Sequence, residues 1–150
     1  MKISDFLAAA DDVKADVAAP DKKKLLSLLA SDAATKLNLP GDRITAALLK
    51  REELGSTGVG GGVAIPHARF TEAKAPLGVL VRLKKAIDYE AVDSKPVDIV
   101  FLLLLPDGAA GDKQLGSLAA TARKLRDPAI TAALRRARDG AEMYRVLTAD

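Results

Sequence analysis

The sequence predicts an α/β fold: a single three-layer domain in which a mixed β-sheet lies between helices. Several segments repeat apolar residues at three- and four-residue steps, which is typical of amphipathic helices. They alternate with segments of alternating or continuous apolar residues, which is typical of strands. No linker or internal repeat divides the 150 residues, and 49% of them are hydrophobic. We therefore expect one layered domain over residues 1–150 with one sizeable core.

The first third of the chain is predicted to be mostly helical. A short amphipathic segment, Ile3–Ala10, precedes a strand at Val13–Val17. The leucine and alanine spacing in Pro20–Leu37 predicts a helix, which the turn residues of Asn38–Pro40 end. A second helix, Asp42–Leu54, begins with an aspartate that is expected to serve as its cap.

The middle of the chain changes character in residues 55–62, where glycine occupies five of eight positions. This density is too high for a helix or a regular strand interior, so a loop is expected. An extended segment, Val63–Ile65, follows. Pro66 keeps the residue before it in the β or polyproline region, and His67 comes directly afterwards.

The last part of the chain combines two strands and three helices. Alternating apolar residues in Leu77–Lys84 predict a strand with one buried face, and the continuous apolar run Val97–Leu105 predicts a central strand buried on both faces. Helices are expected at Leu115–Leu125, at Asp127–Ala137 and at Asp139–Leu147. Each of the last two begins with an aspartate cap.

The composition excludes several kinds of site. The chain has no cysteine, so it has neither disulfides nor thiolate metal sites, and its single histidine excludes a multi-histidine zinc site. We expect no metal and no cofactor. Aromatic residues make up only 3% of the chain, which disfavours base stacking on exposed rings.

The charge pattern, the N-terminal sequence and the shortness of the apolar runs indicate a cytoplasmic protein. The pI is about 9.2, but 23 basic residues are interspersed with 20 acidic ones, as on solvated helix faces. No nucleic-acid partner is therefore expected. The N-terminus lacks an apolar signal core, and the longest apolar run, Ile99–Leu105, is far shorter than the ~20 residues that span a bilayer, so no stable membrane insertion is expected.

The segment around His67 carries the groups that bind phosphate. Consecutive glycines allow backbone N–H groups to approach an anion closely. Hydroxyl donors precede them, and Arg51 and Arg69 offer planar guanidinium groups. The expected phosphate-binding residues are Ser56, Thr57, Gly58, Gly60, Gly61 and Gly62.

A neutral imidazole is a nucleophile near pH 7, because its free pKa is ~6.5. His67 therefore fits a phosphoryl acceptor whose charged product is stabilised by fixed donors. The residues alone leave a second interpretation open, namely a structural or surface histidine beside a mobile loop. The patterns of nucleotide-binding loops are not matched.

Three stretches resemble the fructose/mannitol/nitrogen-regulatory type of phosphotransferase-system enzyme IIA. The segment from Gly55 to Gly60, continued by Ala64–His67, is similar to the active-site signature of that family. Leu48–Leu54 resembles the helix before the signature, and Lys95–Pro106 resembles the central strand. The resemblance covers nearly the whole chain.

The resemblance implies a transferase with a phosphohistidine intermediate. By this resemblance, His67 accepts phosphate from a histidine phosphocarrier protein and Arg51 stabilises the phosphoryl group. It implies no catalytic role for Arg69. One position departs from the family pattern: Gln114 stands where a second active-site histidine is usual. Its amide can donate a hydrogen bond but cannot carry a positive charge, so onward transfer is in doubt.

The sequence thus leads to a phosphoryl-transfer regulatory protein whose phosphorylation state signals to partner proteins. The chain ends after one domain, which favours the nitrogen-regulatory branch. Two alternatives stay open: a sugar-specific enzyme IIA that passes phosphate to an enzyme IIB, and a non-catalytic interaction module in which phosphotransfer has decayed. A nucleic-acid binder would rest on the pI alone.

Overall fold

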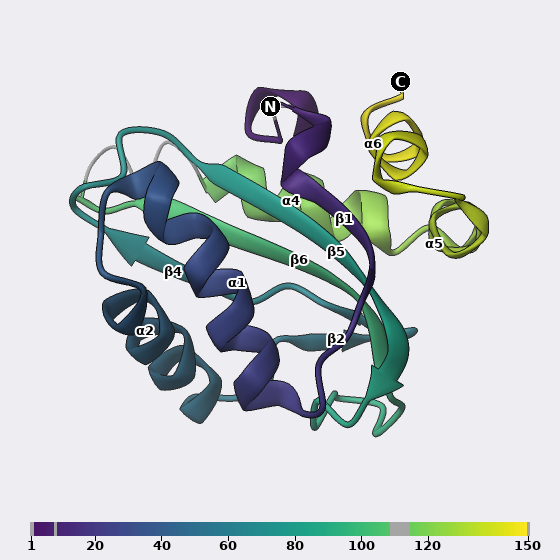
Figure 1. Ribbon diagram of the computed structural model, residues 1–150, viewed down its shortest axis with the longest axis horizontal. Helices are drawn as coiled ribbons and strands as arrows, with labels where there is room; N and C mark the ends of the chain where they lie inside the picture. The colour runs from purple at the N-terminus through teal and green to yellow at the C-terminus, as the bar shows by residue number, and fades with distance from the viewer. Residues whose placement is uncertain (1, 8, 109–114, 150) are drawn as a thin grey trace.

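The computed structural model describes residues 2–7, 9–108 and 115–149, which form a mixed β-sheet between two layers of helices (Figure 1). The strand order is β1-β5-β6-β3-β2, and β4 also pairs with β6. The strands are β1 (Val13–Val17), β2 (Gly58–Gly60), β3 (Val63–Ala64), β4 (His67–Phe70), β5 (Leu77–Ile87) and β6 (Val97–Pro106). Parallel pairs (β1 with β5, β3 and β4 with β6) and antiparallel pairs (β5 with β6, β2 with β3) both occur, so the predicted fold class is confirmed.

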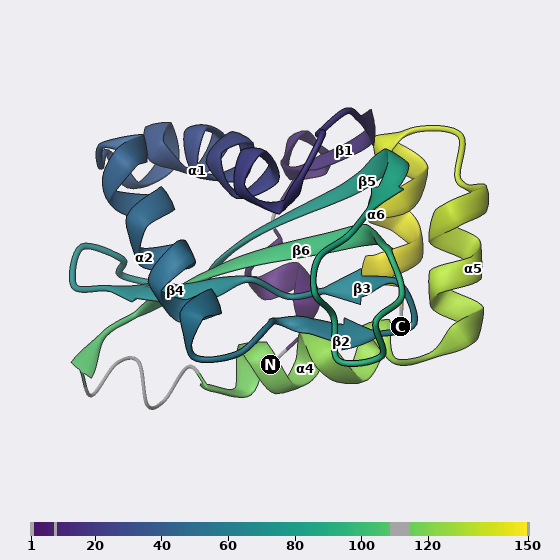
Figure 2. The ribbon, with the colours of Figure 1, turned by 90° about the horizontal axis from the view of Figure 1, so that it is seen from below.

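The helices cover both faces of the sheet (Figure 2). On one face lie α1 (Lys22–Leu37) and α2 (Gly41–Glu53). The other face is covered by α4 (Leu115–Leu125), α5 (Pro128–Arg136) and α6 (Gly140–Thr148), together with the short 3₁₀ turns η1 (Ile3–Asp5) and η2 (Ala10–Asp12). All the predicted helices and strands are therefore present. β1 and α4 have the predicted ends, and the ends of the others are shifted.

The central strand β6 is buried on both faces, as its continuous apolar run predicts. Val100, Leu102 and Leu104 pack into the core beneath α1 and α2. The alternate residues Ile99 and Leu103 pack into the core formed with α4, α5 and α6. Because successive side chains of a strand point to opposite faces, this one strand contributes to both cores.

Strands β3 and β4 lie end to end along the same edge of β6. Val63 of β3 pairs with Ile99, and His67 of β4 pairs with Leu103, both in parallel register. Pro66 separates the two strands, and its carbonyl accepts a hydrogen bond from the Leu103 N–H at 2.9 Å. Pro66 thus interrupts the pairing along β6 without shifting its register, and His67 is held on the sheet.

Three aspartate caps hold helix N-termini. Asp21, Asp127 and Asp139 each accept a hydrogen bond from a backbone N–H two or three residues later, at 2.8–2.9 Å. The predicted cap at Asp42 is wrong. The helix begins one residue earlier, because the Pro40 carbonyl already accepts from the N–H groups of residues 43 and 44, so Asp42 lies inside the first turn.

Residues 55–62 were expected to form a loop, and this prediction is wrong in part, because the segment contains a strand. Its middle forms β2, which pairs with β3 as a short hairpin. A side chain at Gly58 would lie 2.7–2.8 Å from Ala91, so the glycine permits a close backbone approach. The Val92 N–H donates to the Gly58 carbonyl at 3.0 Å. A contact with a loop more than thirty residues away therefore stabilises a strand that local propensity disfavours.

Candidate functional site

His67 is the first residue of β4. Ala68 and Phe70 belong to the core beneath α1 and α2, whereas His67 lies at the edge of the sheet, where the end of α2 reaches it. The ring is half-buried. His67 follows the predicted extended segment Val63–Ile65. It also begins the strand β4, which was not predicted.

The two ring nitrogens of His67 have different partners. Nδ1 lies 3.0 Å from the carbonyl oxygen of Ile65. A carbonyl can only accept, so Nδ1 carries the proton. Nε2 accepts a hydrogen bond from Arg51, so it is unprotonated. Burial is the main cause that lowers the pKa of His67, and the Ile65 carbonyl partly opposes it. The charges of Arg51 and Arg69 lower this pKa further, whereas Glu52 raises it. The ring is therefore neutral at pH 7, as a nucleophile requires.

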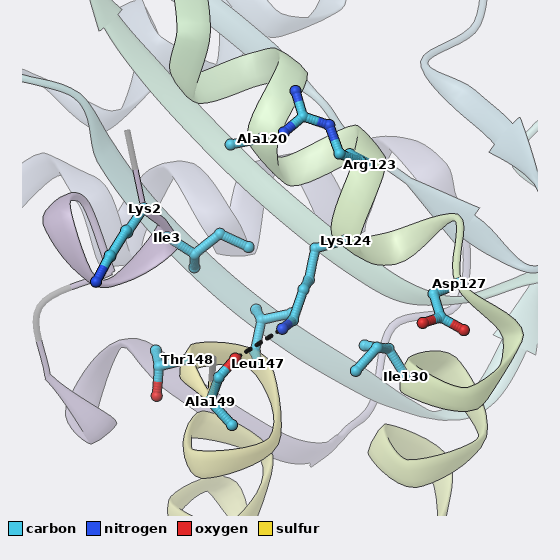
Figure 3. Close-up of a pocket in the computed structure, with 10 residues that line it drawn as sticks. All are labelled: Lys2, Ile3, Ala120, Arg123, Lys124, Asp127, Ile130, Leu147, Thr148 and Ala149. Carbon is cyan, nitrogen blue, oxygen red and sulfur yellow. Dashed lines mark hydrogen bonds between the residues drawn. The ribbon is translucent and has the colours of Figure 1, made fainter.

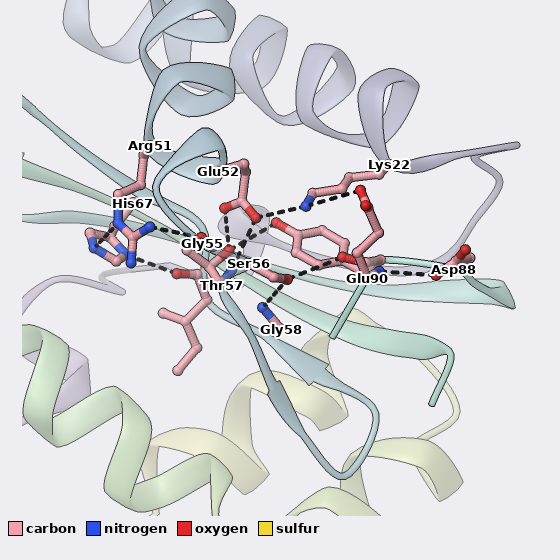
Figure 4. Close-up of polar contacts among 12 residues, drawn as sticks. Lys22, Arg51, Glu52, Gly55, Ser56, Thr57, Gly58, His67, Asp88 and Glu90 are labelled. Carbon is pink, nitrogen blue, oxygen red and sulfur yellow. Dashed lines mark hydrogen bonds and ion pairs between the residues drawn. The ribbon is translucent and has the colours of Figure 1, made fainter. Parts of the chain in front are cut away.

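Arg51 lies in the last turn of α2 and reaches the histidine (Figure 4). Its Nε donates to Nε2 of His67 at 3.3 Å, and its Nη1 donates to the Gly55 carbonyl at 2.9 Å. Within the part of the chain that the structure describes, Arg51 forms no ion pair. Its charge thus faces a neutral ring and is available to an anion. The structure thus brings together Arg51 and His67, two of the predicted site residues.

The hydroxyls of Ser56 and Thr57, which were expected to bind phosphate, have internal partners instead. Ser56 Oγ donates to the Tyr89 carbonyl at 3.1 Å and accepts from the Gly58 N–H at 3.0 Å. The Thr57 side chain is buried, donates to the Glu52 carboxylate, and lies 3.0 Å from the Tyr89 hydroxyl. These contacts fix the segment between α2 and β2, so the two residues support the site from behind.

The turn of the glycine hairpin, which contains Gly60, Gly61 and Gly62 of the predicted phosphate-binding residues, lies away from His67. The Gly62 carbonyl accepts from the N–H of Ile99, whereas His67 pairs four residues further along β6, a separation of about 13 Å along the strand. The Gly61 N–H already donates to the Asp93 carboxylate at 3.0 Å. Positive φ angles of 102°, 66° and 81° show that these glycines form a left-handed turn.

Around His67 the surface is an open depression of about 450 Å³. Three basic side chains line it: Lys50, Arg51 and Arg69. Leu54, at the end of α2, also lines it and is 84% exposed. The depression therefore combines positive charge, which attracts phosphate, with an apolar group that a partner protein can cover. Gln114, the residue matched to the second family histidine, lies outside the described residues.

A separate hollow of about 300 Å³ lies between α4, α6 and η1 (Figure 3). Lys124 donates across it to the Ala149 carbonyl at 2.8 Å, and His67 is not among its lining residues. In the described ranges, no cluster of three or more histidine or carboxylate groups could hold a metal ion. None of the helices in those ranges is both long enough and apolar enough to cross a membrane.

Comparison with known proteins agrees with this geometry. Residues 7–150 match the family described as phosphoenolpyruvate-dependent sugar phosphotransferase system, EIIA 2. A nitrogen regulatory protein of Bradyrhizobium diazoefficiens is 42% identical over 147 residues, covering 98% of this chain and 95% of that protein. The crystal structure of nitrogen regulatory protein IIA-Ntr from Neisseria meningitidis has a TM-score of 0.90 at 32% identity, covering 97% of this chain and 99% of that one.

The crystal structure of IIA mannitol from Escherichia coli shares the fold, with a TM-score of 0.75 at 17% identity over 95% of this chain and 99% of that one. The family match and the likenesses to the Bradyrhizobium and Neisseria proteins span nearly the whole chain. They include α2, the glycine-rich segment and β4, which build the site. The chain therefore belongs to the EIIA 2 family of the phosphoenolpyruvate-dependent sugar phosphotransferase system and is similar to nitrogen regulatory proteins.

Proposed function

We propose that Nε2 of His67 accepts a phosphoryl group from a histidine phosphocarrier protein, and that the phosphorylated and free forms signal to different partner proteins. One observation carries the proposal: the unprotonated Nε2 lies 3.3 Å from the guanidinium group of Arg51, which no carboxylate of the described residues neutralises. A structural histidine would need neither the fixed tautomer nor the adjacent free charge.

The transfer exchanges one phosphorus–nitrogen bond for another. The lone pair of Nε2 attacks the phosphorus of the donor phosphohistidine, a new bond forms to Nε2, and the donor imidazole leaves. The proton on Nδ1 stays on the ring, hydrogen-bonded to the Ile65 carbonyl, so no side-chain base is required. Arg51 turns its Nε–H from the ring nitrogen to a phosphoryl oxygen and stabilises the charge there.

A regulatory role is supported by the likeness to nitrogen regulatory proteins, which extends over 98% of the chain. On this proposal the protein acts in the cytoplasm, where a phosphoenolpyruvate-dependent kinase and its phosphocarrier supply the phosphoryl group. The identity of the partner is a separate question from the identity of the acceptor.

The test uses the upstream kinase, the phosphocarrier and phosphoenolpyruvate. Intact-mass spectrometry at neutral or alkaline pH should show one phosphoryl adduct on the wild-type chain, removed by acid, and none on His67→Ala. An equal adduct on His67→Ala would overturn the acceptor. Absence of any adduct would leave a binding module as the function, and rapid transfer to a fructose- or mannitol-type enzyme IIB would indicate sugar transport.

A further inference from the structure

A buried carboxylate lies directly behind Arg51. The Glu52 side chain is only 6% exposed. Its Oε1 accepts from the Thr57 N–H at 3.0 Å and pairs with Lys22 Nζ at 3.0 Å, and its Oε2 accepts from the Thr57 hydroxyl. Glu52 is therefore a satisfied buried anion with three charged or polar contacts (Figure 4).

Tyr89 completes this cluster from the far side. Its hydroxyl lies 3.0 Å from Thr57 Oγ1, and Lys22 Nζ lies 4.5 Å from the centre of its ring. Burial, followed by the charge of Glu52, raises the pKa of Tyr89, so its hydroxyl keeps its proton. The cluster thus joins α1, α2, the residue before β2 and the loop after β5.

The placement of Glu52 is unfavourable for a residue that contributes only to stability. An acidic side chain in the last turn of a helix opposes the helix dipole, and burial of an ion pair is often no better than an apolar pair. What the cluster does achieve is geometric. It folds residues 55–57 back against the end of α2, so that the Gly55 carbonyl meets Arg51 Nη1 at 2.9 Å.

We infer that Glu52 is a positioning residue for phosphoryl transfer, acting through Thr57 and Gly55 on Arg51. The inference rests on the proposed function of His67. The Gly55 carbonyl holds Nη1 as a pivot, while Nε is free to turn from the ring nitrogen to the phosphoryl oxygen. Without the Glu52–Thr57 contacts the pivot moves, and Arg51 loses its fixed direction.

The test compares Glu52→Gln with Glu53→Gln. Both remove one negative charge from the end of the same helix, but Glu53 is exposed. Misplacement of a positioned group by about 1 Å lowers rates on the order of 10- to 100-fold, so kcat for phosphorylation of Glu52→Gln should fall by that factor. KM for the phosphocarrier should stay within about twofold, because the contact acts on the transition state. Glu53→Gln should match the wild type.

A second measurement does not depend on phosphotransfer. In the unphosphorylated protein, a nuclear Overhauser cross-peak should join the Arg51 Nε–H to the ring protons of His67. The cross-peak should persist in Glu53→Gln and disappear in Glu52→Gln. A cross-peak and a kcat in Glu52→Gln that both equal those of Glu53→Gln would overturn the inference.

A threonine pair keeps the inference testable if Glu52→Gln does not fold. Thr57→Ser retains the hydroxyl that contacts Glu52 and Tyr89, whereas Thr57→Val removes it. Thr57→Ser should keep both the rate and the cross-peak, and Thr57→Val should lose both. Equal behaviour of the two variants would contradict positioning. A wild-type protein that shows the cross-peak but takes no phosphoryl group would refute the proposed function alone.

Discussion

Arg51 and Arg135 both donate to a carbonyl of the glycine-rich segment, but the structure uses their charges differently. Arg51 Nη1 contacts the Gly55 carbonyl at 2.9 Å, and Arg135 Nη2 contacts the Gly61 carbonyl at 2.8 Å. Arg135 also forms a two-point ion pair with Asp98, with both contacts at 2.9 Å. Among the described residues, the further partner of Arg51 is a neutral ring.

The difference teaches that a contact with the glycine-rich segment does not by itself identify a phosphate ligand. At the Arg135 end the positive charge is neutralised, and the arginine fastens the hairpin to α5. At the Arg51 end the same kind of carbonyl contact orients a charge that stays available. The two ends should therefore respond differently to substitution.

The largest effect is expected for Arg51→Ala. Loss of a preorganised charge at the transition state should slow phosphorylation of His67 on the order of 100-fold or more. The fold should be unaffected, because the side chain lies at the surface end of α2. Rapid-quench kinetics with the phosphorylated carrier measure the rate. Arg135→Ala is the matched control and should keep the wild-type rate, and an equal loss in both variants would remove the distinction.

Gly62→Ala should lower stability by about 1–3 kcal/mol, the range for a residue held at an unfavourable backbone angle. The φ of Gly62 is +81°, and an added Cβ would lie 2.5 Å from Arg135 Nη2. Gly61→Ala is the control, since its φ is +66° but no neighbour lies within 4 Å. Urea unfolding gives both free energies of unfolding. A larger loss in Gly61→Ala would show that Arg135 moves aside freely.

A smaller effect, about 1 kcal/mol of unfolding free energy, is expected for Arg135→Ala. The side chains of Arg135 and Asp98 are 37% and 26% exposed, so solvent screens their attraction. Thermal unfolding should show the loss. Asp98→Ala should lower the free energy of unfolding less in the Arg135→Ala variant than in the wild type. Full additivity would mean that the ion pair contributes nothing.

The smallest effect concerns the pKa of His67, which should lie below the ordinary value of 6.5 because burial disfavours the charged ring. The phosphorylation rate should then be constant at neutral pH and fall only as the pH drops through this lowered pKa. A proton NMR titration follows the single histidine directly. Arg51→Ala should raise the pKa, since Arg51 lowers it, whereas Arg135→Ala should leave it unchanged. A wild-type pKa above 6.5 would contradict the buried neutral ring.

Local sequence signals predicted most of the fold. The apolar run of β6 and the aspartate caps at Asp127 and Asp139 act over a few residues, and each is confirmed. The strand β2 was missed because it depends on a distant contact, between Gly58 and the loop at residues 91 and 92. Asp42 was misassigned because Pro40, two residues earlier, caps the helix instead.

In the site, too, local sequence signals placed some residues correctly, whereas contacts between distant segments could not be predicted. His67 and Arg51 could be placed together because they flank one recognisable segment. The partners of Ser56 and Thr57 could not be foreseen, since Tyr89 lies more than thirty residues away and Glu52 was assigned no role. A hydroxyl before a glycine run is equally compatible with a ligand contact and with an internal one, and only the tertiary structure distinguishes them.

Because β6 contributes side chains to both cores, the two helical layers cannot lose their packing independently of the sheet between them. We therefore expect one cooperative unfolding transition and the slowest amide hydrogen exchange along β6 and the strands bonded to it. His67 belongs to this slowly exchanging part through its pairing with Leu103, whereas Arg51 lies near the end of α2, where helices fray. We therefore expect the His67 ring to keep its place during phosphoryl transfer, while the Arg51 side chain turns about its contact with the Gly55 carbonyl.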